Sequence, residues 1–150
     1  MDLDEQYNKI YRYCYFRLHR REIAEDITQE TFLRFLESHD YVNTGKTMQY
    51  LYTIARNLCI DEYRKQKTEI MDDEVVDIYA EDNMITRISV RTALAELNEA
   101  DRELLLLRYV NEVPVSVICK LYGISRFAVY RKISQATKNL KEKLGKEDFT

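Results

Sequence analysis

Basic, aromatic and amide side chains that could recognise nucleic acid gather near the C-terminal end of the sequence. The residues from 120 to 146 include eight bases and a single acid, Glu142. Arginine and glutamine can read the edges of base pairs, whereas lysine mainly neutralises phosphate charge. On a helix in this segment, the side chains expected to face outward are Arg126, Phe127, Tyr130, Arg131 and Gln135, followed by Lys138, Lys141 and Lys143. This composition predicts contact with duplex DNA.

The residues around this segment have the spacing of a helix-turn-helix motif. Cys119 is small where two crossing helices must approach, and Gly123 follows where the chain needs a left-handed or tight turn. Ser125 stands where its hydroxyl can cap the second helix. The apolar residues that would join the two helices are Ile118, Ile124, Val129 and Ile133. We expect the second helix to enter a major groove. The alternative is an ordinary helical hairpin with a solvated basic face.

A second candidate interface is acidic and apolar. Its members share one face of a helix and are Asp26, Gln29, Glu30 and Leu33, beside Phe32 and Leu36. Two acids at positions i and i+4 repel each other by roughly a few tenths of a kcal/mol, and a basic partner surface would remove that cost. The face is therefore a candidate protein interface, with a solvated acidic surface as the alternative.

A third group of residues interleaves aromatic rings with cations and an amide. On the helix expected over 47–66, it comprises Tyr50, Tyr52, Arg56, Asn57, Tyr63 and Arg64. Aromatic faces among cations can stack on unpaired bases while the cations hold the phosphates. Because most aromatic residues on helices belong to a core, packing is the alternative for these rings.

Nothing in the sequence argues for catalysis, and we expect no enzyme activity and no cofactor. The three cysteines are far apart and form no CxxC, and only His19 and His39 could add imidazole, so neither a zinc site nor a disulfide framework is expected. The acidic N-terminus lacks the order of a signal peptide. With no run of about 18 apolar residues, no membrane-spanning helix is expected either, and a cytoplasmic location is the default.

The elements that must position these residues are helices. The chain has 150 residues but three Gly and one Pro, which disfavours strands joined by many tight turns. Apolar periodicity predicts helices over 4–18, 22–37, 47–66, 84–97, 99–110, 115–121 and 125–143. The first is expected to bury Leu3, Tyr7, Ile10, Cys14 and Leu18, the second Ile23, Ile27, Thr31 and Phe35, and the third Met48, Leu51, Ala55 and Leu58. Gly145 is expected to end the last helix.

Charge divides the chain into three parts. Residues 1–67 are neutral overall, 68–83 carry seven acids and no base, and 84–150 have a net charge of +4. Like charges repel and favour an extended chain, so the acidic segment is the natural boundary. The sequence therefore predicts an all-α protein in which two small helical domains, 1–67 and 84–150, are joined by an acidic linker, 68–83. A short helix around 74–79 is the alternative for that linker.

These motifs together resemble the sigma-70 family of bacterial RNA polymerase sigma factors, in the small extracytoplasmic-function (ECF) type. The segment from Asp26 to Phe32 resembles the core-binding motif of region 2.2. The segment 50–58, with Asp61 and Arg64, resembles regions 2.3 and 2.4, and the helix-turn-helix resembles region 4.2. The resemblance covers roughly residues 5–143, although Tyr50 stands where the family usually has tryptophan.

The resemblance implies a function in promoter-specific transcription initiation and a role for each motif. Core RNA polymerase would contact Asp26, Gln29, Glu30, Phe32, Leu33 and Leu36. The melted minus-ten strand would meet Asn43, Tyr50, Arg56, Asn57, Ile60 and Arg64. The duplex minus-thirty-five element would meet Ser125, Arg126, Phe127, Tyr130, Arg131 and Gln135. An anti-sigma factor is a further partner that only the resemblance suggests.

Two other functions remain open from the residues alone. A dimeric helix-turn-helix repressor would use the basic helix, but it would leave the acidic face of 22–37 unexplained. A helical adaptor that binds only protein would leave the net charge of +7 over 120–146 without a purpose. Binding to core polymerase, followed by promoter-dependent transcription, separates these functions from that of a sigma factor.

Overall fold

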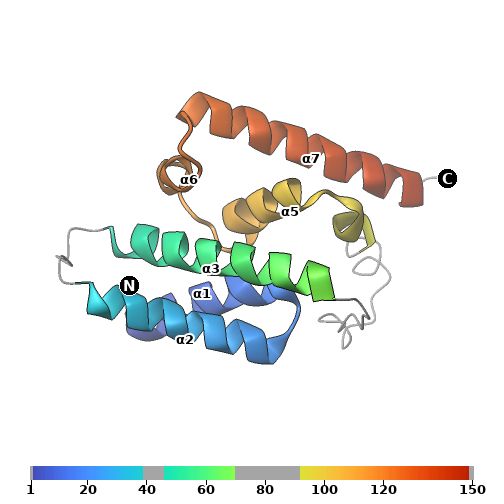
Figure 1. The fold of residues 1–150 in the computed structure, drawn as a ribbon. Coiled ribbons are helices and arrows are strands. Elements are labelled where there is room, and N and C mark those ends of the chain that lie inside the picture. The colour runs from blue at the N-terminus through green and yellow to red at the C-terminus, as the bar shows by residue number, and fades with distance from the viewer. Residues whose placement is uncertain (1, 39–45, 70–91, 149–150) are drawn as a thin grey trace. The chain divides into compact units, whose positions relative to one another are not determined.

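The computed structural model describes residues 2–38, 46–69 and 92–148, and the regular elements in these ranges are helices (Figure 1). The chain divides into two compact units, which are Met1–Val76 and Asp77–Thr150. The all-α class with two helical domains is therefore confirmed. The linker predicted over 68–83 falls almost wholly outside the described residues, as does Asn43.

The described part of the first unit consists of three helices, and each packs on the other two. They are α1 (Leu3–Leu18), α2 (Arg21–Glu37) and α3 (Thr47–Glu69). Helix α1 begins where the Asp2 carboxylate accepts the backbone N–H of Glu5 at 2.9 Å. It ends at His19, which takes a left-handed conformation and donates its backbone N–H to the Tyr15 carbonyl at 2.7 Å. This local chemistry fixes the sharp turn into α2.

Small and aromatic residues share the core of the first unit. Cys14, Ala24, Ala55 and Cys59 are fully buried, and small side chains allow helices to approach closely. Among the buried polar residues are Thr28 and Thr31, whose hydroxyls donate to backbone carbonyls one turn earlier at 2.7 Å each. These internal bonds satisfy groups that would otherwise be costly to bury.

The predicted buried stripes hold only in part: Tyr7, Ile23 and Met48 are partly buried, and three further differences stand out. Leu3 is 66% exposed because it is the first residue of α1 and lies outside the packed interface. Tyr52, expected among the base-stacking rings, is only 2% exposed and meets the Tyr13 ring edge-on with centroids 5.8 Å apart. Cys59 is fully buried, whereas Leu58 is only partly so. Helix α3 packs on two neighbours at once, which gives it a wider buried face than one apolar stripe indicates.

Helical residues 92–96 begin the described part of the second unit, followed by α5 (Glu99–Leu105), the π-helix η1 (Leu106–Val110), α6 (Val115–Tyr122) and α7 (Arg126–Asp148). Leu97, Leu105 and Ala136 form a core cluster, with Leu94 and Leu140 packed against it. This cluster joins α5 to α7 and to the residues before α5.

Arg102 closes the C-terminal end of the helical segment whose described residues are 92–96. Its Nη1 donates to the carbonyls of Leu94, Ala95 and Leu97 at 3.0–3.2 Å, and its Nη2 lies 2.7 Å from a Glu99 oxygen. The last carbonyls of a helix have no partner within it, so a guanidinium is a suitable donor for them.

Three helix ends differ from the prediction, the first being that of α3, which runs to Glu69 and not to 66. The helix expected over 99–110 changes to a π-helix after Leu105, with the Asn111 N–H bonded to the Leu106 carbonyl at 2.9 Å. This wider turn begins within a run of four buried leucines, 104–107, and leaves Tyr109 exposed. Gly145 was expected to end the last helix, but it lies inside α7. One glycine costs a helix about 1 kcal/mol relative to alanine, and α7 continues past it.

The two tyrosines Tyr50 and Tyr52 give a test of this core. Tyr52→Ala should lower the free energy of unfolding by about 3–5 kcal/mol, because it empties a large buried volume. Tyr50→Ala should change it by less than about 1 kcal/mol, because that ring is largely outside the core. Urea denaturation followed by circular dichroism measures both, with Tyr52→Phe as the control that keeps the ring. Equal losses from the two alanine variants would contradict this assignment.

Candidate functional site

The turn between α6 and α7 has the geometry expected of a helix-turn-helix. Gly123 adopts a φ of 68°, in the left-handed region that side chains rarely enter, and its N–H donates to the Cys119 carbonyl at 2.8 Å. The Ser125 hydroxyl accepts the backbone N–H of Ala128 at 3.1 Å and so caps α7. Ile118 and Val129 are fully buried between the helices. The predicted turn and cap are both confirmed.

The outer face of α7 carries the side chains predicted to read duplex DNA. Phe127 is 75% exposed, and Arg126, Tyr130, Arg131 and Gln135 are exposed as well. The Arg131 guanidinium carbon lies 5.3 Å from the centre of the Phe127 ring. A cation over an aromatic face is held there by attraction to the ring. Arg131 and Phe127 therefore form one surface, as the sequence predicted.

A buried acid that sequence reasoning missed ties α6 to α5. Glu103 is buried, and its Oε1 accepts the Tyr122 hydroxyl at 2.8 Å. Tyr122 is the last residue of α6, directly before the turn at Gly123. The only sequence signal for this contact was an acid directly before a run of four leucines. The bond holds the first helix of the motif against the core of the unit.

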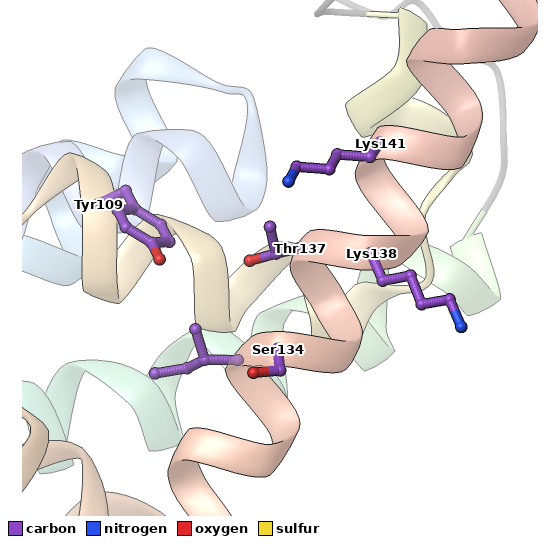
Figure 2. A pocket seen from close by; sticks show the side chains of 6 residues that line it. Tyr109, Ser134, Thr137, Lys138 and Lys141 are labelled. Atoms are coloured by element: carbon purple, nitrogen blue, oxygen red, sulfur yellow. The ribbon is translucent and has the colours of Figure 1, made fainter.

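A shallow depression also lies in the second unit, beside η1 and α7 (Figure 2). It measures about 400 Å³ and is lined by Tyr109, Ile133, Ser134, Thr137, Lys138 and Lys141. Figure 2 shows that Lys141 extends over the same side as Thr137 while Lys138 points away. Within the described residues the Thr137 hydroxyl oxygen is buried without a hydrogen-bond partner. Sequence reasoning did not anticipate this depression, because its lining comes from two separate segments.

The acidic and apolar face predicted on the second helix is present on α2. Asp26 and Gln29 are exposed, and Leu33 and Leu36 remain 54% and 72% exposed. The face therefore combines exposed acidic and amide groups with two exposed leucines, as the sequence predicted.

Two members of the α2 face are engaged within the chain. The Glu30 carboxylate accepts the Arg34 Nε at 2.8 Å, which offsets the expected repulsion from Asp26. Phe32 is half-buried and stacks on Tyr7 with ring centres 5.5 Å apart. Phe32 therefore joins α2 to α1 and presents only part of its ring to the outside.

The residues predicted to meet single-stranded DNA lie along one side of α3. Tyr50, Asn57 and Arg64 are exposed at intervals of seven residues, which is close to two helical turns. Arg56 and Ile60 lie beside this row and are half-buried. Tyr50 is 46% exposed, in contrast to the buried Tyr52. The row presents one aromatic ring, an amide and a guanidinium outward.

Two other properties concern only the described residues. Across 2–38, 46–69 and 92–148, no group of three or more histidine, cysteine or acidic side chains could hold a metal ion. None of the helices in these ranges is long and apolar enough to cross a membrane.

Comparison with known proteins identifies both units. Residues 3–69 match the Sigma-70 region 2 family, and residues 87–140 match the Sigma-70 region 4 family. The ECF RNA polymerase sigma factor SigM of Bacillus subtilis is 30% identical over 154 residues, with 94% of each chain covered. The ECF sigma factor BldN of Streptomyces coelicolor is 29% identical over 84% of this chain, and the match spans about half of BldN, 52%.

A solved structure supports the same fold. The sigma factor RpoE of Bartonella quintana, crystallised with the anti-sigma factor NepR, superposes with a TM-score of 0.75 at 19% identity. The match covers 93% of this chain and 91% of RpoE. The paired region 2 and region 4 matches, together with the near full-length similarity to SigM, show that the chain belongs to the sigma-70 family of RNA polymerase sigma factors, in its ECF group.

Proposed function

We propose that this sigma factor directs core RNA polymerase by reading the minus-thirty-five element as duplex and the minus-ten element as a melted strand. The observation that carries the proposal is the exposed face of α7, where Arg131 lies over the 75% exposed ring of Phe127. These large side chains contribute nothing to the core, and they follow a capped turn typical of DNA-reading helices. A major groove accepts such a helix.

Different exposed residues of α7 have different tasks. Arg126 belongs to the first turn, where unpaired backbone N–H groups favour an anion, so it contacts phosphate. Arg131 lies further along with Phe127 and contacts base edges. The Ser125 oxygen accepts the capping bond, and its hydroxyl proton can still be donated to a phosphate.

The outward row on α3 captures the minus-ten strand. The exposed Tyr50 ring stacks on a base that has left the duplex, and Asn57 offers an amide to a base edge. Arg56 and Arg64 add positive charge for the phosphates, and Ile60 adds apolar contact. Asn43 belongs to the same predicted site, although it lies outside the described residues.

The α2 face binds core polymerase. Its acids favour a basic surface on the partner, and Leu33 and Leu36 supply apolar area. Core polymerase carries out the chemistry of RNA synthesis, so this chain contributes promoter recognition and no enzymatic step. It acts in the cytoplasm, where the polymerase and the DNA are. The proposal also includes two domains, 1–67 and 84–150, that are joined by the acidic linker 68–83.

An anti-sigma factor regulates the chain under this proposal. RpoE of Bartonella quintana was crystallised with such a partner, NepR. Co-purification from cells, followed by inhibition of transcription with the purified partner, tests this part of the proposal.

Reversing the charge of Asp26 tests the polymerase interface. Asp26→Arg should weaken binding to core polymerase at least about tenfold, because a reversed charge at a docked face costs several kcal/mol. Glu96→Arg is the matched control, since it changes the same charge at an exposed site of the other unit. Titration of fluorescent chain with core polymerase measures both affinities. Wild-type affinity in Asp26→Arg would leave α2 as a solvated face.

Tyr50→Ala and Asn57→Ala test strand capture. Both should slow promoter opening more than closed-complex formation, because stacking worth about 1–3 kcal/mol per base exists only after melting. A template with a pre-melted bubble should therefore restore most of the transcription. Tyr50→Phe keeps the ring and serves as the control. If the bubble restores nothing, the two residues act elsewhere.

The two arginines of α7 test the division of tasks. Arg131→Ala should cost about 1–3 kcal/mol on the preferred promoter and relax preference at one base pair. Arg126→Ala should weaken all sequences alike and reduce the salt slope by about one. Holoenzyme binding across a range of salt, on matched and single-substituted minus-thirty-five elements, separates the two effects. The opposite pattern would mean that α7 is rotated differently in the groove.

A further inference from the structure

A chain of hydrogen bonds runs from α5 to the DNA-facing side of α7. The Gln135 Nε2 donates to the Asn139 Oδ1 at 3.0 Å. The Asn139 Nδ2 in turn donates to the Asp101 Oδ2 at 2.8 Å, across 38 residues of sequence. An exposed residue of the proposed minus-thirty-five face is thus connected, through one half-buried amide, to a carboxylate on another helix.

Two features hold the Asp101 carboxylate in place. Its own backbone N–H donates to the Asn98 Oδ1 at 2.8 Å, and the Asn98 Nδ2 lies 3.4 Å from the Asp101 Oδ2. These bonds form the N-terminal cap of α5. The apolar cluster that contains Leu105 and Ala136 packs α5 against α7 nearby. The carboxylate is therefore a fixed acceptor in the frame of the second unit.

The chemistry of the three groups sets the direction of every bond. A carboxylate only accepts, whereas an amide has donors on nitrogen and an acceptor on oxygen. Asp101 therefore turns the Asn139 nitrogen toward α5 and leaves the Asn139 oxygen for Gln135. That oxygen can pair only with a donor, which is the Gln135 nitrogen, so the Gln135 Oε1 and its second N–H stay available for a base edge.

We propose that Asp101 and Asn139 are positioning residues that fix the orientation of the Gln135 amide, and thereby the base that Gln135 prefers. An amide that offers one acceptor and one donor in fixed order pairs with adenine at N6 and N7. The expected preference is therefore for adenine at the base pair that Gln135 meets. This inference rests on the proposed function, in which Gln135 contacts the minus-thirty-five duplex.

The first test uses holoenzyme and a pool of promoter duplexes in which the minus-thirty-five element is randomised. The bound fraction is sequenced for wild type, Gln135→Ala, Asn139→Ala and the double variant. Asn139→Ala should reduce the adenine preference about tenfold at the same base pair as Gln135→Ala, given the discrimination of a bidentate contact. It should cause no further change in the Gln135→Ala background, and other base pairs should keep their preferences.

The second test exchanges the two side chains of the hydrogen bond between Asp101 and Asn139. Asp101→Asn alone leaves an amide at 101 that accepts either orientation of Asn139, and Asn139→Asp alone places two carboxylates together. Combined, the amide at position 101 can donate to the carboxylate at position 139, which still accepts from Gln135. The combination should restore the adenine preference that each single change reduces. A residue with a merely structural role would give no such recovery at a single base pair.

The outcomes separate this inference from the function on which it rests. If Gln135→Ala changes no base preference, both the Gln135 assignment and the inference are wrong. If Gln135→Ala changes a preference that Asn139→Ala leaves intact, the inference alone is overturned and the proposed function stands. A uniform loss of binding to all sequences in Asn139→Ala, or failure of the exchanged pair to recover the preference, also overturns it.

Discussion

The structure depends on one constraint, which is that each unit must build a hydrophobic core from about 70 residues. Small helical domains bury a smaller share of their surface than large ones, so they have few apolar side chains to spare. Leu33, Leu36, Tyr50, Phe127 and Tyr130 nonetheless remain on the surface. Under this constraint, the large exposed side chains on α2, α3 and α7 are the residues to which the proposed function assigns contacts with polymerase and DNA.

Different kinds of contact join the helices in the two units. In the first unit, aromatic contacts join the helices, since the Tyr13 ring packs edge-on against Tyr52. The Tyr13 hydroxyl also accepts a hydrogen bond from the Arg17 Nη1 at 2.7 Å. In the second, polar side chains of α5 hold neighbouring segments, as Arg102 and Glu103 do. Both contacts brace the frame that carries α7. Under the proposed function a rigid frame matters there, because base reading depends on the direction of hydrogen bonds.

Sequence patterns predicted the parts of the fold that depend on neighbours along the chain. Helix periodicity located Ile10 and Cys14 in the core, and turn chemistry located Gly123 and the Ser125 cap. The acidic α2 face was also recognisable, because its residues lie within eleven positions of each other.

Contacts between distant segments were not predictable in the same way. Tyr52 could equally be a base-stacking ring or a core ring until its packing on Tyr13 was known. The hydrogen bond between Asp101 and Asn139 joins residues 38 positions apart, and no periodic pattern in the sequence indicates it. The change to a π-helix after Leu105 depends on how α5 packs, which propensity does not encode.

The central claim is that the DNA-reading faces act within a polymerase complex. The most direct test compares promoter binding by the purified chain alone with binding by the chain reconstituted with core polymerase, in gel-shift assays at physiological salt. The account predicts weak duplex binding by the free chain, since each reading unit is small and seven acids lie over 68–83 between them. It predicts tight, promoter-specific binding by the reconstituted complex. Tight, sequence-specific binding by the chain without polymerase would contradict it.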